Sequence, residues 1–268
     1  MFRSGEEMMK IILVSILFIC SNFILAGEPF IVAHRGASKK APENTLPAFK
    51  LAWEQGADAI EADFRLSKDG HIVCIHDSDT KRVSGKKLNV SKSTLAELRK
   101  LDVGSFRGNS FKGTIIPTIE EVFSTIPPKK KIFIEVKCGI EIIPALLEKT
   151  KKSGLKDEQI VIISFKEEVI ELMKSKAPQF KAFLLKSIKK DTSLKSVLAT
   201  LEKIKADGLS TDTKKIDEKF VKGVLASGFQ HHVWTINDVK TANRFKALNV
   251  MSITTDIPDL IRSGISEK

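Results

Sequence analysis

The chain has 268 residues, 42% of them hydrophobic, and its 44 lysine and arginine residues outnumber 33 acidic residues to give a formal charge of +11. This length is enough for one large hydrophobic core, and a single α/β barrel of about 250 residues would use it without a second domain. Nucleic acid is not an expected partner, because the sequence has no basic stripe with interleaved aromatic residues, no zinc-ligand spacing and no Gly-Lys-Ser phosphate loop.

The positive charge gathers in short lysine clusters at expected helix ends and loops, at 129–131, 149–152, 189–190 and 214–215. A solvated surface is the simplest interpretation of these clusters. Peripheral attraction to an anionic membrane surface, or to phosphorylated substrates, is the alternative. The sequence does not define an oligomeric state.

The first 26 residues differ from the rest of the chain. After Lys10 an apolar run extends to Ala26, which is a small residue suited to a cleavage site. The run is shorter than the roughly 20 apolar residues of a spanning helix. We therefore predict a signal peptide over 1–26 and an exported domain over 27–268, in the periplasm, in the cell envelope or secreted. An uncleaved anchor is the alternative, since Ile24 is bulky for its place near the cleavage site.

From residue 30 onward, short β-branched runs alternate with amphipathic helical stretches, the pattern of βαβ units around a parallel sheet. Strands are expected at 30–34, 59–66, 72–76, 131–137, 160–165, 182–186, 208–211, 232–236 and 252–255, and helices include 46–55, 167–176, 194–205 and 220–226. Eight strands would close a (β/α)8 TIM barrel, with 72–76 as a return arm after the Asp69-Gly70 turn. The stretch 78–117, rich in Lys, Ser and Gly, is expected to be a short insertion after the second strand rather than a domain.

Three carboxylates are predicted to meet at the mouth of this barrel. Residues two apart in a strand face the same way, so Glu61 and Asp63 should project together, and Glu135 should join them from a nearby apolar strand. Crowded carboxylates repel one another unless a cation joins them, and an all-oxygen ligand set favours Ca²⁺ or Mg²⁺ over zinc. The sequence therefore predicts one divalent cation, without distinguishing between these two.

Two histidines are expected at the same mouth. His34 closes an apolar strand and is followed by Arg35, while His76 closes the return arm. Imidazoles titrate near neutrality, so such a pair can act as base and acid on a phosphodiester. Arg35 would offer a planar donor fork to phosphate oxygens, and Lys137 a point charge.

The remaining histidines and cysteines are given structural roles. His71, His231 and His232 have no comparable charged company. Cys74 and Cys138 lie in or beside predicted strands, so they are expected to be small buried hydrophobic residues rather than a disulfide.

The first βα loop contains Glu43, Asn44 and Thr45 just before a predicted helix with Pro47 in its first turn. At least one of Asn44 and Thr45 is expected to cap this helix. Asn44 has the alternative of reaching the metal or a phosphate oxygen.

The ordered set of motifs resembles the glycerophosphodiester phosphodiesterase family over essentially the whole predicted mature chain. The matching motifs are His34-Arg35-Gly36, Pro42-Glu43-Asn44-Thr45, Gly56-Ala57-Asp58, Ile60-Glu61-Ala62-Asp63, Asp69-Gly70, His76-Asp77, Ile116-Pro117-Thr118 with Glu121, Glu135-Val136-Lys137, Ser164-Phe165, Val233-Trp234-Thr235-Ile236-Asn237 and Thr254-Thr255-Asp256-Ile257-Pro258.

The resemblance implies a metal held by Glu61, Asp63 and Glu135, and phosphate contacts from Arg35 and Lys137. It implies His34 as base and His76 as acid, in an order that could be exchanged. Trp234 resembles the aromatic wall at the glycerol end of the site, although a tryptophan of the core would have the same pattern.

The expected activity is metal-dependent hydrolysis of a glycerophosphodiester to an alcohol and sn-glycerol 3-phosphate, through attack of the glycerol 2-hydroxyl and a cyclic phosphate. One alternative is lysophospholipase D-like hydrolysis of lipid phosphodiesters. Another is a non-catalytic envelope protein that binds phosphorylated glycerol.

Overall fold

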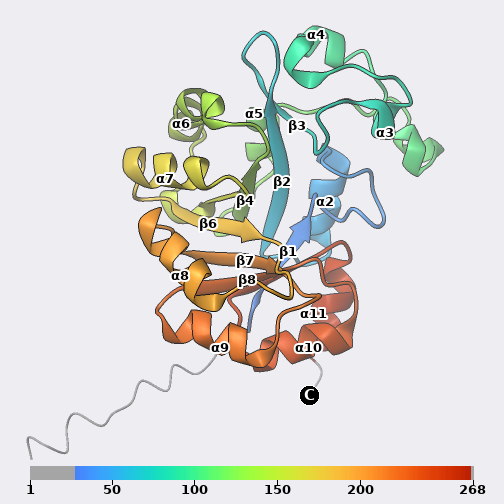
Figure 1. The fold of residues 1–268 in the computed structure, drawn as a ribbon. Helices are drawn as coiled ribbons and strands as arrows, with labels where there is room; N and C mark the ends of the chain where they lie inside the picture. Colours follow the sequence, from blue (N-terminus) through green and yellow to red (C-terminus); the bar gives the residue numbers. More distant parts are fainter. Residues whose placement is uncertain (1–27, 267–268) are drawn as a thin grey trace, which may run out of the picture.

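The computed structural model describes residues 28–266, so the predicted signal peptide lies outside the described residues. Eight parallel strands form a closed barrel (Figure 1): β1 (Phe30–His34), β2 (Ala59–Leu66), β4 (Lys131–Val136), β5 (Ile160–Ser164), β6 (Lys181–Lys186), β7 (Gly208–Asp212), β8 (Gln230–Trp234) and β9 (Ser252–Thr255). β1 pairs with both β9 and β2, which completes the ring. The predicted TIM barrel is confirmed.

Helices follow the strands and cover the outside of the barrel (Figure 1): α2 (Leu46–Glu54), α5 (Ile119–Phe123), α6 (Ile143–Lys152), α7 (Glu167–Lys176), α8 (Leu194–Lys203), α9 (Glu218–Ala226), α10 (Val239–Ala247) and α11 (Pro258–Ser266), with short 3-10 turns η4 (Ile140–Ile142) and η5 (Asp157–Gln159). In α7 the apolar residues Val169, Ile170 and Met173 recur at helical spacing and are buried. No helix within residues 28–266 is long and apolar enough to cross a membrane.

The barrel interior has a floor of apolar side chains below the mouth. Because alternate strand residues face the same side, Val32, Ala59 and Phe133 lie one layer below His34, Glu61 and Glu135. All three floor residues are buried, and each large side chain removed from water in this way contributes about 1.5–3 kcal/mol. The polar mouth therefore stands on a packed, dry base.

The insertion after β2 is confirmed and forms a small lobe beyond the end of β2 (Figure 1). It contains β3 (Ile72–Cys74), α3 (Lys81–Ser84), η1 (Val90–Lys92), α4 (Leu95–Leu98), η2 (Ser105–Arg107) and η3 (Asn109–Phe111). Its own apolar cluster, with Val83, Leu98 and Ile116 among its members, holds the lobe together beside the barrel.

The return arm ends earlier than the sequence indicates, at Cys74 instead of His76. One edge of β2 pairs with β1 up to Glu61 and with β3 only from Phe64 onward. β3 must stop where the edge of β2 turns to β1, so His76 lies in the loop just after the arm.

Strand β8 also differs from its prediction, since it begins at Gln230 and ends at Trp234. Its first half contains His231 and His232, which are polar in sequence yet buried in the structure. A strand that buries histidines has no clear hydrophobic pattern, and this explains the two-residue error.

The turn after β1 requires glycine. Arg35 has φ 57° and Gly36 has φ 82°, both in the left-handed region. A Cβ atom on Gly36 would lie 2.6 Å from the carbonyl carbon of Ala48 in α2. This close approach places Arg35 at the barrel mouth.

We predict that Gly36→Ala destabilises the protein more than Gly228→Ala does. Gly228 has nearly the same φ, 81°, but open space around it. Left-handed backbone costs about 1–2 kcal/mol in both variants, and overlap with Ala48 should add about 1–3 kcal/mol in Gly36→Ala alone. Urea unfolding of both variants measures the difference, and equal destabilisation would show that the contact with Ala48 relaxes freely.

Candidate active site

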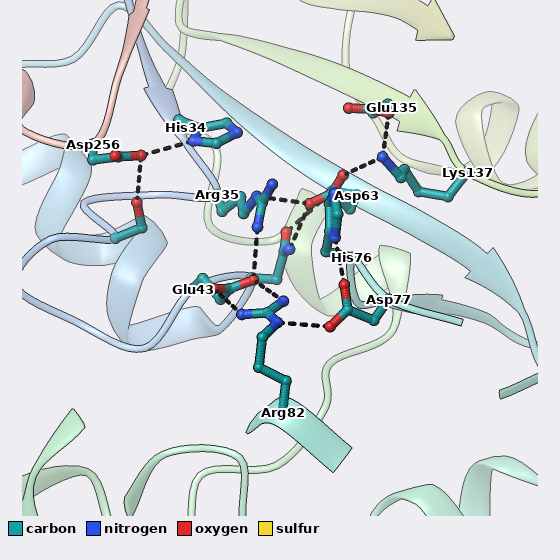
Figure 2. Close-up of polar contacts among 12 residues, drawn as sticks. His34, Arg35, Glu43, Asp63, His76, Asp77, Arg82, Glu135, Lys137 and Asp256 are labelled. Carbon is teal, nitrogen blue, oxygen red and sulfur yellow. Dashed lines mark hydrogen bonds and ion pairs between the residues drawn. The ribbon is translucent and has the colours of Figure 1, made fainter. Parts of the chain in front are cut away.

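The predicted site residues converge at the carboxyl ends of the barrel strands (Figure 2). In the sheet register His34 lies beside Glu61, and Asp63 lies beside Glu135. A pocket of about 140 Å³ is lined by seven of the eight predicted residues: His34, Arg35, Glu61, His76, Glu135, Lys137 and Trp234. The eighth, Asp63, is buried and contacts Arg35 and Lys137 from this wall.

The length of β2 explains how Glu61 and Asp63 reach the mouth from within the strand. Glu61 and Asp63 are the third and fifth of eight residues in their strand and not near its end. They still lie at the mouth, because β2 continues beyond the barrel to pair with β3.

The three carboxylates form a buried cluster. Glu61, Asp63 and Glu135 are 3%, 1% and 8% exposed, and each offers an oxygen within 4.8 Å of the others. Burial, reinforced by Asp63 and Glu135, raises the pKa of Glu61 well above its usual value. Burial and the charge of Asp63 raise the pKa of Glu135 to about 7. The protein therefore stabilises the negative charges of Glu61 and Glu135 incompletely.

The cluster fits a divalent cation. Oε1 of Glu61 and Oδ1 of Asp63 are buried and accept no hydrogen bond within residues 28–266, although Lys137 Nζ lies 3.6 Å from Oδ1. Buried carboxylate oxygens without hydrogen bonds are costly, and a hard cation such as Ca²⁺ or Mg²⁺ would satisfy them. The ligands would be Glu61, Asp63 and Glu135.

Two residues of the β1–α2 loop, Asn44 and Arg35, hold the carboxylate of Asp63 in place. Asn44 donates from Nδ2 to Oδ2 of Asp63 at 2.8 Å, and its Oδ1 accepts from the backbone N of Asp63 at 3.0 Å. Arg35 Nε lies 3.2 Å from Oδ2. Burial opposes ionisation of Asp63, but Arg35 and Lys137 outweigh it and hold its pKa below the usual value.

These contacts give Asn44 and Thr45 different roles in the loop. Thr45 is the N-cap of α2 and accepts from the backbone N of Ala48, as expected for one of the two candidates. Asn44 orients the carboxylate of Asp63.

His34 is oriented by a carboxylate behind it. Its Nδ1 lies 2.7 Å from Oδ1 of Asp256, which also accepts from Ser38 Oγ at 3.0 Å (Figure 2). Asn237 Nδ2 donates to the other oxygen of Asp256 at 2.6 Å. Burial favours neutral Asp256, but the hydrogen bond from His34 leads the contacts that lower its pKa to about 2. An ionised carboxylate only accepts, so Nδ1 donates to it and Nε2 is the nitrogen left for a substrate.

His76 has the same arrangement on the other side of the pocket (Figure 2). Its Nδ1 lies 2.6 Å from Oδ1 of Asp77, whose other oxygen accepts from Arg82 Nε at 2.6 Å. Burial alone would raise the pKa of Asp77, but these hydrogen bonds outweigh it and lower the pKa to about 2. Burial lowers the pKa of His76 itself, against the opposing charge of Asp63. Its Nε2 is therefore also the nitrogen left for a substrate.

Glu43 joins the two sides of the site. It accepts from Arg35 Nη1 at 3.0 Å and from Arg82 Nη1 and Nη2 at 2.7 and 2.9 Å. Although burial favours its neutral form, Arg82 and Arg35 keep its pKa low. The chain of contacts from Arg35 to Asp77 thus holds Arg35 and His76 in one network.

The far wall of the pocket combines one cation with two aromatic rings. Lys137 Nζ lies 2.6 Å from Oε1 of Glu135 and 5.7 Å from the ring centre of Phe165. The ring of Phe165 packs edge-on against the ring of Trp234, with 5.7 Å between the two ring centres. Nε1 of Trp234 is buried and has no hydrogen-bond partner among the described residues.

Sequence reasoning assigned no role to Asp256, Asp77, Glu43 or Arg82. In the sequence, Asp77 directly follows His76 and Asp256 directly follows the strand β9. Their place beside strand ends is the signal that could have identified them. Arg82 comes from the insertion and meets Glu43 across 39 positions, so no local pattern reveals it.

The residues given structural roles are not among those that line this pocket. His231 and His232 are buried, and desolvation lowers their pKa values to about 4 and about 3. Cys74 is buried, Cys138 is half-buried, and both are free thiols, as expected.

Residues 34–260 match the sequence model of the glycerophosphoryl diester phosphodiesterase family. The chain belongs to this family. The glycerophosphodiester phosphodiesterase of Caldanaerobacter subterraneus subsp. tengcongensis is 36% identical over 245 residues, covering 88% of this chain and 99% of that protein.

Solved structures agree with this glycerophosphodiester phosphodiesterase assignment. A phosphodiesterase of Oleispira antarctica, in complex with the product sn-glycerol-3-phosphate, aligns with a TM-score of 0.83 at 30% identity, covering 90% of this chain and 98% of that one. The glycerophosphodiester phosphodiesterase of Thermotoga maritima aligns with a TM-score of 0.72 at 30% identity, covering 88% and 98%.

We predict that Ca²⁺ or Mg²⁺ stabilises the protein through this cluster. A cation at about 100 times its Kd adds about 2.7 kcal/mol, which for a domain of this size raises Tm by about 5–10 °C. Protons compete for carboxylates with raised pKa values, so the stabilisation should weaken as pH falls from 8 to 6. Thermal unfolding with and without cation measures it.

Glu61→Gln should lose this stabilisation, whereas Glu54→Gln, on the exposed end of α2, should keep it. An equal response in both variants would place the cation elsewhere.

Proposed function

We propose that the protein hydrolyses glycerophosphodiesters to an alcohol and sn-glycerol 3-phosphate, with one divalent cation, Ca²⁺ or Mg²⁺, and two histidines. The observation that carries this proposal is the pair of imidazoles, each backed by an ionised aspartate, at one pocket with the carboxylate cluster. The relative from Oleispira antarctica, solved with sn-glycerol-3-phosphate, supports the same product.

The phosphodiester would lie between the two histidines. Arg35 and Lys137 line the pocket and place positive charge beside the phosphate oxygens. When bound, the cation adds positive charge and Lewis acidity for oxygens on phosphorus. Trp234 and the apolar floor residue Phe133 give the glycerol carbons a wall without competing hydrogen bonds.

The Nε2 atoms move the protons. In the first step the glycerol 2-hydroxyl oxygen bonds to phosphorus, and its proton passes to Nε2 of the imidazole that starts neutral. The bond from phosphorus to the alcohol oxygen breaks, and the other imidazole, which starts protonated at Nε2, gives that oxygen its proton. Water then opens the cyclic phosphate with the two roles reversed, which restores both imidazoles and leaves glycerol 3-phosphate.

We predict that His34→Ala and His76→Ala each lower kcat by about 100-fold to 10,000-fold, since each removes a proton-transfer group. His71→Ala is the matched control, because His71 is exposed and lies outside the pocket. Release of glycerol 3-phosphate from a soluble glycerophosphodiester is the measurement. Full activity in either of the first two variants would refute the mechanism.

A lysophospholipid assayed beside the soluble diester distinguishes the lipid-directed alternative. The proposal expects the soluble substrate to have the higher kcat/KM. Binding of the diester without turnover, with cation present, would instead support a binding protein.

Export remains a proposal that rests on residues 1–26, and attraction to anionic membranes remains a prediction from the net charge. Expression of the full chain with intact-mass measurement tests export. A mature protein that begins at Gly27 is expected, and a mass that retains residues 1–26 would favour the uncleaved anchor.

A further inference from the structure

A second cavity adjoins the active-site pocket. It has a volume of about 240 Å³ and shares His34 and Arg35 with the first. From these residues it continues past Ser38 to Lys39, on the barrel side, and Arg107, from the insertion. A group bound between His34 and Arg35 would therefore border both cavities.

The acidic residues of this second cavity are already engaged. Asp256 accepts hydrogen bonds from His34, Ser38 and Asn237. Glu43 is paired with Arg35 and Arg82. By contrast, Lys39 and Arg107 form no ion pair with any residue in the range 28–266. The cavity therefore offers two positive charges that the described part of the protein does not neutralise.

Both cationic residues are held by hydrogen bonds. Lys39 donates its backbone N–H to the carbonyl of Asp256 at 3.1 Å. Arg107 donates from Nη2 to the carbonyl of Ser38, which ties the insertion to the barrel loop.

The turn that bears Arg107 is held by Asp102. Its carboxylate accepts from the backbone N–H groups of Gly104, Ser105 and Gly113 at 2.8, 2.9 and 2.9 Å. Hydrogen bonds within the insertion therefore fix the position of Arg107.

We propose that this second cavity is the subsite for the leaving alcohol, and that Lys39 and Arg107 select alcohols carrying a second anionic group, a carboxylate or a phosphate. The inference rests on the proposed function. A diester has two arms on phosphorus: the apolar-floored pocket accommodates glycerol, and the basic cavity accommodates the other arm. The extra anion then lies beside two cations without unpaired acidic neighbours.

The arrangement also orders the proton transfers. His34 lines both cavities, whereas His76 lines only the first of them. His34 is then beside the leaving oxygen and supplies its proton, and His76 takes the proton of the glycerol hydroxyl. This is the reverse of the order expected from the sequence.

The test uses two diesters that differ by one carboxylate, glycerophosphoserine and glycerophosphoethanolamine, with cation-loaded enzyme. Two exposed ion pairs, each worth about 0.2–1 kcal/mol, correspond to a kcat/KM that favours the serine diester by about twofold to thirtyfold. The ratio should shrink in about 1 M salt, where charges are screened within about 3 Å.

Lys39→Gln and Arg107→Gln should each lower the ratio, and the double variant should bring it close to one. Arg107→Lys should keep most of it, because the charge remains. Lys112→Gln is the matched control, an exposed lysine of the same lobe outside the cavity, and should leave the ratio unchanged.

A ratio near one in the unmodified protein, or a preference that persists in the double variant, overturns the subsite while leaving the phosphodiesterase activity established. Hydrolysis of neither diester overturns the proposed function and the subsite together.

Discussion

Mutual repulsion among three buried carboxylates is the constraint on which the site depends. Glu61, Asp63 and Glu135 lie too close together and too far from water to be ionised together at low cost. The surrounding protein supplies only part of the compensation, through Arg35 and Lys137. A divalent cation would complete it, and the same positive charge would suit the phosphodiester of the proposed reaction, so one ion would both relieve the repulsion among the carboxylates and serve the proposed chemistry.

The barrel makes this crowding rigid. Parallel register sets His34 beside Glu61 and Asp63 beside Glu135, and the apolar layer beneath fixes the strands that carry them. Loops and the insertion then add what strands cannot. Asn44 orients Asp63, while Asp256 and Asp77 fix the tautomers of the two histidines. The network holds the charged side chains, and both imidazoles line the pocket.

Much of this could be predicted from sequence because strands have a period of two and the site residues lie in or directly after apolar strands. That pattern is enough to predict Glu61, Glu135 and His34 at one mouth. Contacts across the insertion could not be predicted in this way. Arg82 and Arg107 reach Glu43 and Ser38 only through the folded lobe, and nothing local in their surroundings indicates a partner. The buried histidines of β8 shifted a strand boundary for the related reason that burial of polar residues depends on tertiary partners such as Thr211 and Ser252.

The most direct measurement is anomalous diffraction from crystals soaked with Mn²⁺ and glycerol 3-phosphate. We expect the anomalous peak of a Mn²⁺ ion coordinated by oxygens of Glu61, Asp63 and Glu135. The phosphate is expected between Nε2 of His34 and Nε2 of His76. A cation bound away from these carboxylates, or a phosphate bound outside the two histidines, would contradict this expectation.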